Sequence, residues 1–554
     1  MSSKKKDNKQ PQKKAKRFAW ISPGRNVIIS GLLIGFSFPI IDIIPTASLA
    51  WIGFVPLLFE LEKHLNNFKR YVWSAFLVMV IFNAISACWV LVATIPGALI
   101  LWFPHAFINT IPFLILYLIQ RRIGWATSLF LLPFLWTVWE WLHIQSEFSF
   151  PWLLMGNTQS TIPLMIQYAE FTGVWGITLW VMSINICFYF FVKGYRAKMQ
   201  MQLITVSVIL AFLIIFPSIY YFVVTDDESF RQKSEPLKVT IVQQNVDPFA
   251  KWDFEKFPII MNRLFKLTDQ SVAKEKPDLL VWPETAIPYY ILMSGPEGEF
   301  RAKLLEKVDY WNTALLTGFS DVDIYDDSTQ RKPFTFFEKE TGLYYDPFNS
   351  AMIVQPGFTN PKVYRKIKLV PFAEKVPYSD IFPSIANYTF SVAGISGWIE
   401  GDSVSVLPLI RENQDTIGIA GLICFEGLYP DYVTEFIRKG AQVLIIITND
   451  GWFGPTHALL QHASFARIRA IETRRPLVRC GNTGISFFVD RFGRVSGQLP
   501  WWEELTSTQE IYPESKITFF VKHPDLVPQI CLVFSFLLPL LSFILKHIRK
   551  VKKP

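Results

Sequence analysis

The chain has 554 residues, which is enough for two or three domains. With 51% apolar and 18% charged residues, it is too apolar for a purely soluble enzyme and too charged for a protein wholly embedded in lipid. The net charge of +8 comes largely from the two ends, Lys4 to Arg17 and Lys546 to Lys553. Such clusters beside apolar stretches are typical of cytoplasmic membrane flanks and argue against a nucleic-acid partner.

The first part of the chain predicts a series of membrane helices. Residues 1–25 are rich in Lys and Gln and are expected to form a disordered, basic cytoplasmic tail. The apolar stretch that follows has no convincing small-residue cleavage site, so it indicates a retained helix rather than a signal peptide. Apolar stretches of about 20 residues, the length that spans a bilayer, then recur. They predict helices near 27–44, 47–62, 72–93, 97–119, 126–143, 170–192, 203–224 and 526–546.

The distribution of basic residues predicts the orientation of these helices. The connections after the second, fourth and sixth helices are basic, whereas those after the first, third and fifth carry almost no Lys or Arg. This alternation places both termini in the cytoplasm and residues 225–525 outside, in the periplasm if the membrane is a bacterial inner membrane. We therefore expect about seven helices over 26–224, a last helix over 526–546 and a basic cytoplasmic tail over 547–554. The basic residues are Lys63, Lys69, Arg70, Arg121, Arg122, Lys193, Arg196 and Lys198.

The segment 225–525 has a different pattern. Short aliphatic or β-branched stretches alternate with helical patterns over 254–273 and 458–473, while 295–312 and 375–400 are interpreted as loops. Continuous apolar strands suit sheets that are buried on both faces, so the pattern predicts a layered α/β domain. The expected strands are 238–243, 279–282, 314–318, 350–354, 416–423, 443–448, 477–479 and 484–489.

Three of the expected strands lead directly into polar residues, namely Glu284, Lys366 and Cys424. Ligand sites in α/β folds tend to form at the carboxyl ends of strands, so these three side chains are candidates for one nucleophilic site. Glu284 could accept the thiol proton, Lys366 could stabilise an oxyanion, and Cys424 could act as the nucleophile. Taken singly, each residue has an ordinary alternative. Glu284 could be a turn residue, Lys366 a solvated lysine and Cys424 a buried, inert thiol.

Other kinds of site receive little support from the sequence. The five cysteines form no CxxC pair, so neither a disulfide framework nor a cysteine metal site is expected. His457 and His462 are five residues apart rather than four, and no HExxH is present. No Gly-rich phosphate loop occurs. The sequence therefore predicts no metal and no cofactor.

The order of several motifs along the chain, together with the predicted arrangement of membrane helices, resembles that of a known family. The segments that contain Glu284, Lys366 and Cys424 resemble the Glu-Lys-Cys signatures of the nitrilase (carbon–nitrogen hydrolase) superfamily. The whole chain from about 25 to 545 resembles the apolipoprotein N-acyltransferase family. The matching segments are 242–245, 282–286, 364–366, 369–374, 424–426, 448–454, 467–472, 475–479 and 482–484, with Trp252 and, on the membrane side, 150–153, Gly156 and Gln159.

The chain departs from the family pattern at three positions. Phe425 stands where the family usually has Tyr, Ala373 where it has Gly, and Gln244 where it has Gly. Phe425 lacks the hydroxyl that a Tyr could offer to a substrate or intermediate, so no role of that hydroxyl can be carried over. None of the three changes affects the candidate Glu, Lys or Cys.

The resemblance implies a fold of about eight membrane helices and a nitrilase-like αββα sandwich, and a two-step reaction. Cys424 takes an acyl chain from a membrane phospholipid as a thioester, and the N-terminal amine of an S-diacylglyceryl-cysteine apolipoprotein then receives it. In this reaction Glu284 serves as base and acid, and Lys366 stabilises the intermediates. Glu374, Glu426 and Phe425 are expected to support the site. Candidate substrate-binding residues are Trp152, Trp252, Asn449 and Trp452.

Two other functions are open at this point. A membrane-tethered amidase could use the same three residues on a small C–N substrate, with water in place of the amine. A non-catalytic lipid-binding or transport protein would be expected to carry ionisable residues within its spans, and the expected spans contain few beyond Glu140 and Glu170. The chain is expected to act as a monomer, with lipids and apolipoproteins as its partners.

Overall fold

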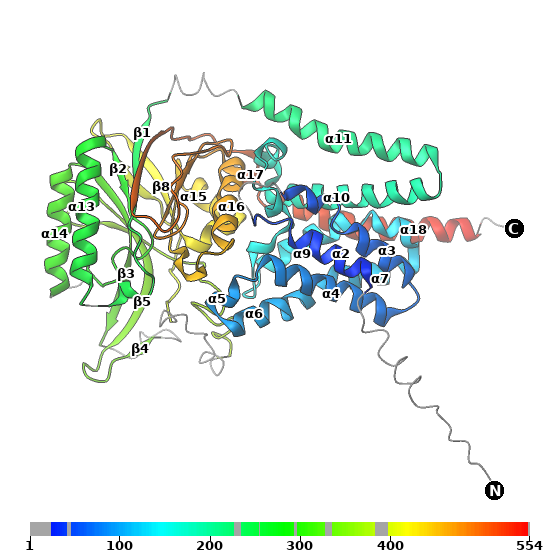
Figure 1. Ribbon diagram of the computed structural model, residues 1–554, viewed down its shortest axis with the longest axis horizontal. Helices are drawn as coiled ribbons and strands as arrows, with labels where there is room; N and C mark the ends of the chain where they lie inside the picture. Colours follow the sequence, from blue (N-terminus) through cyan, green and yellow to red (C-terminus); the bar gives the residue numbers. More distant parts are fainter. Residues whose placement is uncertain are drawn as a thin grey trace, which may run out of the picture.

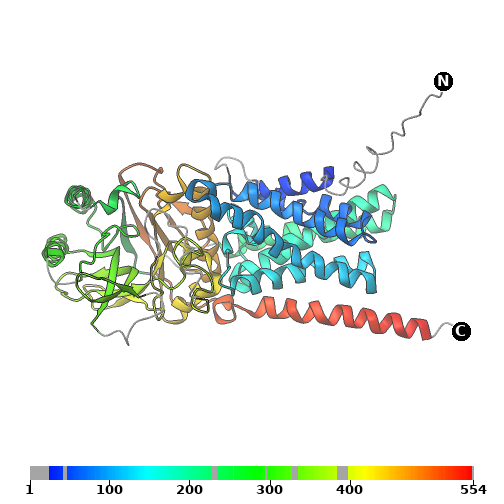
Figure 2. The same cartoon turned by 90° about the horizontal axis from the view of Figure 1, so that it is seen from below.

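The computed structural model describes residues 24–40, 46–225, 234–253, 255–292, 296–326, 335–382 and 397–551. These residues form a helical bundle joined to an α/β domain, which lie side by side along the long axis of the molecule (Figures 1 and 2). The predicted tail over 1–25 falls almost entirely outside the described residues, as does the end of the tail over 547–554.

The bundle contains helices from both ends of the chain. Short 3-10 helices connect them at η1 (Ala47–Trp51), η2 (Pro151–Leu153), η3 (Met155–Gln159) and η4 (Pro163–Met165). The last helix, α18, runs from the α/β domain to the far end of the bundle (Figure 2). The helices are α2 (Arg25–Gly35), α3 (Val55–Lys63), α4 (Phe68–Ser86), α5 (Val90–Ala93), α6 (Ile95–Trp102), α7 (Pro104–Ile123), α8 (Trp125–Leu129), α9 (Leu132–Ile144), α10 (Ala169–Arg196), α11 (Gln200–Val224) and α18 (Leu526–Val551).

The bundle confirms a multi-pass helical domain, but several predicted helices are divided. Within the described residues, four helical segments are long and apolar enough to cross a membrane: 68–86, 95–123, 169–196 and 200–224. The predicted helices 47–62 and 126–143 each consist of two shorter pieces, and 27–44 ends at Gly35. Pro56, Pro104 and Pro133 lie in the first turns of α3, α7 and α9. A proline lacks an N–H and favours the start of a helix over its interior, so these prolines set the breaks.

The α/β domain is built on two sheets that pack face to face. The first has seven strands in the order β13-β1-β2-β3-β5-β4, with β6 also paired to β5, and the second has six in the order β12-β11-β10-β9-β8-β7. The first sheet contains β1 (Leu237–Gln243), β2 (Leu279–Val281), β3 (Ala314–Tyr325), β4 (Phe336–Phe337), β5 (Tyr344–Val354), β6 (Lys362–Arg365) and β13 (Leu505–Ile511). The second contains β7 (Leu407–Ile410), β8 (Thr416–Ile423), β9 (Val443–Thr448), β10 (Leu477–Gly481), β11 (Phe487–Val489) and β12 (Val495–Ser496).

Helices cover the outer faces of both sheets, which gives the predicted αββα sandwich. Helices α13 (Phe257–Glu275) and α14 (Pro296–Trp311) lie on the first sheet, away from the bundle. Helices α15 (Pro430–Arg438) and α16 (Ala458–Thr473) lie on the second sheet and face the bundle (Figure 1). All eight predicted strands are present. The interpretation of 295–312 as a loop was wrong, because residues 296–311 form α14.

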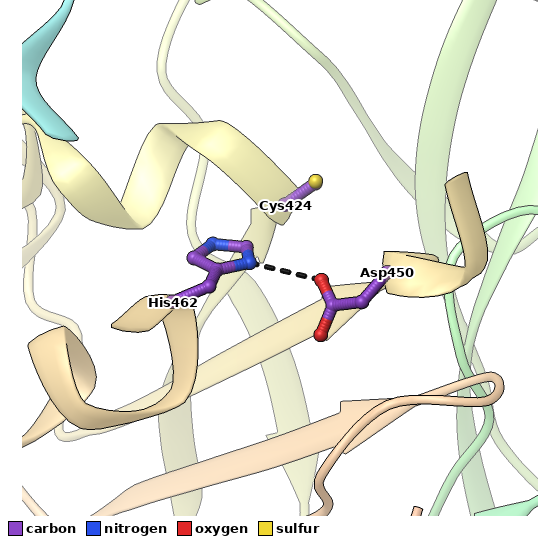
Figure 3. A group of neighbouring side chains, drawn as sticks. All are labelled: Cys424, Asp450 and His462. Atoms are coloured by element: carbon purple, nitrogen blue, oxygen red, sulfur yellow. Dashed lines mark hydrogen bonds and ion pairs between the residues drawn. The ribbon is translucent and has the colours of Figure 1, made fainter. Parts of the chain in front are cut away.

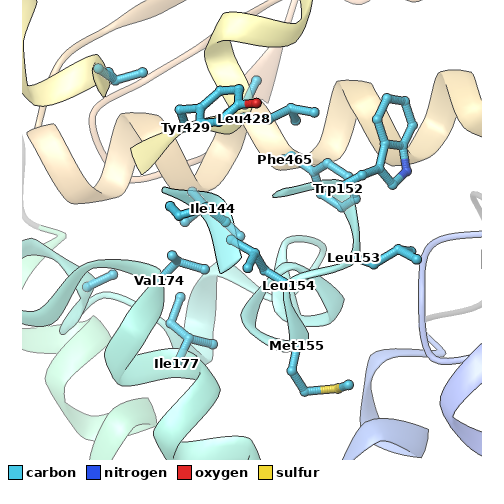
Figure 4. Packing of buried hydrophobic residues seen from close by; sticks show 14 of the residues in the cluster. Ile144, Trp152, Leu153, Leu154, Met155, Val174, Ile177, Leu428, Tyr429 and Phe465 are labelled. Carbon is cyan, nitrogen blue, oxygen red and sulfur yellow. The ribbon is translucent and has the colours of Figure 1, made fainter. Parts of the chain in front are cut away.

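The two halves share a large apolar contact. Apolar side chains from the η2–η3 segment and α10 pack against α16 and the turn after β8, including Trp152, Leu154, Val174, Leu428 and Phe465 (Figure 4). A short helix, α17 (Phe519–Lys522), leads from the sandwich towards α18. Because apolar packing and hydrogen bonds join the two halves, they form one continuous core.

Candidate active site

Each of the three predicted residues lies just beyond the end of a strand. Glu284 follows β2, Lys366 follows β6 and Cys424 follows β8. Cys424 has a left-handed backbone with φ of 53°, a conformation that costs a non-glycine residue about 1–3 kcal/mol. A side chain on Gly318 would lie 2.5 Å from the Thr285 nitrogen and 2.7 Å from the Glu284 Cα, so β3 approaches the Glu284 segment closely only because this residue is glycine.

Lys366 is held between two carboxylates. Its Nζ lies 2.8 Å from Glu374 Oε1 and 3.7 Å from Glu284 Oε1, and its side chain is only 1% exposed. Glu374 is fixed in turn, because its Oε2 accepts a hydrogen bond from the Val370 N–H at 2.8 Å. Burial lowers the pKa of Lys366, but the charges of Glu374 and Glu284 outweigh burial and raise the pKa above its ordinary value. Lys366 is therefore a fixed positive charge.

Glu284 is oriented by two hydrogen bonds. Its Oε1 accepts from the side-chain amide of Asn349, and its Oε2 accepts from the backbone N–H of Asn449, both at 2.8 Å. Asn349 also fixes the lysine strand, because its carbonyl accepts from the Lys366 N–H at 2.9 Å. The carboxylate is therefore held in place while one edge of it faces the lysine.

The surroundings of the Cys424 thiol disfavour its ionisation. Burial and the charge of Glu284 raise its pKa well above the ordinary value, although the charge of Lys366 acts in the opposite direction. A thiol of this kind becomes a nucleophile only when a neighbouring base takes its proton. Glu284 lines the same cavity, and its carboxylate can take the proton from the thiol.

Glu426 joins the cysteine turn to the lysine strand. Its Oε2 accepts from the Ile423 N–H at 2.9 Å, and its Oε1 accepts from the Ile367 N–H at 2.8 Å and from the Tyr364 hydroxyl. The residue is fully buried, and burial raises its pKa. Its hydrogen bonds set the position of Cys424 relative to Lys366, so it supports the site structurally.

One cavity of about 200 Å³ contains the three residues and continues along the helical bundle. Glu284, Lys366, Glu374 and Cys424 form its polar end. Its remaining wall is mostly apolar and includes residues of α5, α6 and α7, so the reacting groups open onto a surface made by the bundle. The bundle residues in this wall are Trp89, Val90, Ala93, Thr94, Gly97, Ile100, Leu101, Pro104, His105, Ile108, Phe148, Ser149, Phe150 and Trp152.

The predicted supporting and binding residues fall into two groups. Trp152, Phe425 and Trp452 line the cavity, and Phe425 packs with its ring 5.6 Å from that of Tyr429. Trp252 and Asn449 do not line this cavity, as far as the described part of the chain shows its wall. Asn449 acts through its backbone N–H on Glu284, and its side-chain oxygen accepts from Asn482 at 2.9 Å.

Sequence reasoning missed a second polar group beside the thiol. His462 of α16 and Asp450 of η9 (Asp450–Phe453) lie next to Cys424, with one ligand-type atom of each within 4.8 Å of the others (Figure 3). In the sequence, His462 stands out only as a possible zinc ligand with His457. Its proximity to Cys424 depends on the packing of α16 against β10, η9 and the turn after β8, which no local pattern reveals.

The Cys424–Asp450–His462 group has side chains of the types that bind zinc, although the sequence predicts no metal. The carboxylate of Asp450 is already engaged, with His462 Nδ1 2.9 Å from Oδ1 and Arg479 Nη2 2.6 Å from Oδ2. Burial raises the pKa of Asp450, but the charges of Arg479 and His462 outweigh it and lower the pKa well below its ordinary value. A metal here would have to compete with the buried Arg479 cation, so the residues fit a metal poorly.

The chain is similar to known proteins over both halves. Residues 238–516 match the carbon–nitrogen hydrolase family, and residues 30–187 match the apolipoprotein N-acyltransferase N-terminal domain. The apolipoprotein N-acyltransferase of Chlorobaculum tepidum is 37% identical over 523 residues, covering 94% of this chain and 96% of that protein. That of Geobacter metallireducens is 28% identical over 541 residues, covering 94% and 95%.

Among solved structures, Saccharomyces cerevisiae Nit3, a member of branch 10 of the nitrilase superfamily, is 16% identical with a TM-score of 0.34. That similarity covers 53% of this chain and 94% of Nit3. The relatives at 37% and 28% identity match nearly the whole length of this chain. The chain therefore belongs to the apolipoprotein N-acyltransferase family and carries a carbon–nitrogen hydrolase domain.

Proposed function

We propose that this chain transfers an acyl chain from a membrane phospholipid to the N-terminal amine of S-diacylglyceryl apolipoproteins, through a thioester on Cys424. The membership of the chain in the apolipoprotein N-acyltransferase family supports the overall reaction. The arrangement of Glu284, Lys366 and Cys424 supports the assignment of roles.

In the first step, Cys424 Sγ attacks the ester carbonyl of the phospholipid while Glu284 takes the thiol proton. The ammonium of Lys366 stabilises the oxyanion of the tetrahedral intermediate. When the intermediate collapses, the C–O bond breaks and Glu284 returns the proton to the oxygen of the departing lysophospholipid. The acyl chain is then held as a thioester.

In the second step, the neutral amine attacks the thioester carbonyl and Glu284 takes a proton from the attacking nitrogen. Lys366 again stabilises the oxyanion. Collapse breaks the C–S bond, and the thiolate of Cys424 regains its proton from Glu284. The product is an amide, and the three residues are ready for another turnover.

The single observation that carries this proposal is the cavity shared by the two halves. Its polar end contains the reacting residues, and its long apolar wall comes from α5, α6 and α7. An acyl chain can lie along such a wall while its carbonyl reaches Cys424. A water-soluble amide would gain nothing from a wall of this kind, which argues against the membrane-tethered amidase.

We also propose that the α/β domain is periplasmic and that both termini are cytoplasmic. The ends of α10 and α3 lie together, because Lys193 pairs with Glu62, while the start of α10 contacts the α/β domain through the Glu170–Arg474 pair. The basic ends of these helices therefore lie opposite the α/β domain. The positive-inside rule makes that basic face cytoplasmic.

The reaction can be tested with full-length protein in mixed micelles that contain a phospholipid with a labelled acyl chain. The acceptor is a synthetic peptide with an N-terminal S-diacylglyceryl-cysteine, and the same peptide with an acetylated N-terminus is the control. We expect labelled amide on the free-amine peptide alone. Release of ammonia from small amides, without acyl transfer, would contradict the proposal and favour the amidase.

A further inference from the structure

The reaction with an ammonium substrate leaves one proton without an acceptor. An α-amine has an ordinary pKa of about 7.7–8.0, so most of the acceptor enters as an ammonium at pH 7. It must lose one proton before the nitrogen can attack and a second during the attack. Glu284 takes the second proton and returns it to the thiolate of Cys424. A base that lines the cavity can accept this first proton and then release it to solvent, which lets the bound ammonium react as well as the neutral amine.

We infer that His462 is a second catalytic base, which takes the first proton from the ammonium of the apolipoprotein acceptor. This inference rests on the proposed acyl transfer. The ring lines the cavity that contains Cys424, and one of its nitrogens lies within 4.8 Å of the thiol sulfur (Figure 3). An amine placed for attack on the thioester therefore lies in the cavity that the imidazole lines.

Asp450 determines which nitrogen of the His462 ring carries the proton. Its Oδ1 lies 2.9 Å from His462 Nδ1, and its Oδ2 accepts from Arg479 at 2.6 Å. Arg479 Nη2 is also 3.0 Å from Nδ1, but a carboxylate is the stronger partner for a ring N–H. With the ring proton on Nδ1, the lone pair is on Nε2, and among the described residues no protein group hydrogen-bonds that nitrogen.

The neighbours of His462 hold the ring in place. It lies against Trp152, with ring centroids 5.2 Å apart, and Asp450 Oδ1 is 2.9 Å from its Nδ1. The imidazole is therefore fixed beside Cys424 before an acceptor arrives.

Two other basic side chains near the site fit this role less well. His105 lines the cavity, but its Nδ1 is hydrogen-bonded by the side-chain amide of Asn83 at 3.1 Å. Lys251 is buried and donates to the Glu284 carbonyl at 3.1 Å, yet it is not part of the cavity wall. Among the described titratable groups, His462 combines proximity to Cys424 with a free acceptor nitrogen.

The test separates the two half-reactions in His462→Asn, because the amide N–H₂ of Asn can replace Nδ1–H towards Asp450 while Nε2 is lost. Acylation is followed by intact mass after mixing full-length protein with phospholipid. Deacylation is followed after adding the diacylglyceryl-cysteine peptide to the acylated protein. His457→Asn is the matched control, since His457 begins the same helix but does not line the cavity.

We expect acylation of His462→Asn within about threefold of wild type, and deacylation at pH 7 slower by roughly tenfold, because only about a tenth of the acceptor amine is neutral at that pH. The deficit should disappear at pH 9, where the acceptor amine is already neutral. A deficit that is equal in both half-reactions, or that does not change with pH, would overturn the inference. Absence of any acyl adduct on wild type would instead refute the proposed function.

Discussion

Lys366 depends on Glu374 more than on any other described group. The two form an ion pair at 2.8 Å in a buried site, while the second carboxylate, Glu284, is 3.7 Å away. Without the charge of Glu374, the ammonium should shift towards Glu284 and block the base. Glu374→Gln should therefore slow acylation roughly a hundredfold, about 2.7 kcal/mol of transition-state stabilisation.

This prediction is checked by the rate of thioester formation in full-length protein. Glu400→Gln is a suitable control, because Glu400 is exposed and pairs with Lys375 outside the cavity. An unchanged acylation rate in Glu374→Gln would show that Lys366 does not need this partner.

Lys251 predicts a pH dependence of stability. Burial lowers its pKa from 10.5 to about 7, despite the opposing charge of Glu284. Between pH 7 and 10.5 the unfolded chain therefore binds more protons at this residue than the folded protein, so stability rises with pH. Lys251→Met removes this effect. The thermal midpoint should rise between pH 7 and pH 9 more in wild type than in Lys251→Met.

The measurement is thermal unfolding in detergent at the two pH values. The exposed Lys274 supplies a control, because Lys274→Met should keep the wild-type dependence on pH. Parallel midpoints for wild type and Lys251→Met would mean that Lys251 is charged in the folded protein.

At the scale of elements, α16 connects the α/β domain to α10. Glu472 of α16 accepts from the Val174 N–H at 2.6 Å and pairs with Arg469 at 2.9 Å, and both charged side chains are buried. Burial raises the pKa of Glu472 to about 7 even though the charge of Arg469 opposes it. The carboxylate thus joins a buried cation of one half to the backbone of the other.

Glu472→Ala should destabilise the protein strongly, because it leaves the Arg469 guanidinium buried without a counter-charge. Breaking a buried pair costs about 3–5 kcal/mol, whereas an exposed pair contributes about 0–1 kcal/mol. Glu504→Ala, which breaks an exposed pair with Arg263, is the matched control. Thermal midpoints in detergent compare the two, and equal shifts would rule out a special role for the α16–α10 contact.

Some elements could be predicted from the sequence and others could not, depending on how apolar they are. Apolar strands such as β8 and β9 can be predicted because a continuous run of aliphatic residues is a clear strand pattern. Strand β13 was missed because Leu505–Ile511 is mostly polar and only half-buried at the sheet edge. Helix α14 is hard to recognise in the sequence because it begins with Pro296 and Gly298, which are also common in loops, although a proline in the first turn is compatible with a helix start.

The residues of the candidate site could also be predicted only in part. Glu284, Lys366 and Cys424 follow recognisable strands, so each could be chosen as a candidate. Their spacing in the sequence could not show that they converge, and only the resemblance to the family implied it. His462 and Lys251 come from a helix and a 3-10 turn, and only tertiary packing brings them near the cysteine and the glutamate. The local sequence therefore predicts site residues at strand ends. It does not predict residues such as His462 and Lys251, which reach the site only through tertiary packing.

At the scale of the whole molecule, the cavity makes the bundle part of the substrate site. Gly97 of α6 lines the apolar wall, and a large side chain there should shorten the space available to an acyl chain. Each methylene that can no longer be buried costs about 0.8 kcal/mol, so two correspond to roughly tenfold. Gly97→Trp should therefore lower the rate with long-chain phospholipids about tenfold relative to short-chain ones.

The rates of acyl transfer from donors of different chain length measure this selectivity. Leu99→Trp is the control, because Leu99 is 48% exposed on the outer side of the same helix and does not line the cavity. Equal losses with long and short donors in Gly97→Trp would indicate that the acyl chain lies elsewhere.

Intact mass spectrometry of the full-length protein in phospholipid micelles tests the thioester on Cys424 most directly. We expect one fatty-acyl increment that maps to Cys424, persists in Cys88→Ala, is absent from Cys424→Ala and disappears when the diacylglyceryl-cysteine peptide is added. Folded protein that transfers acyl chains without this increment, or an increment that survives in Cys424→Ala, would contradict it.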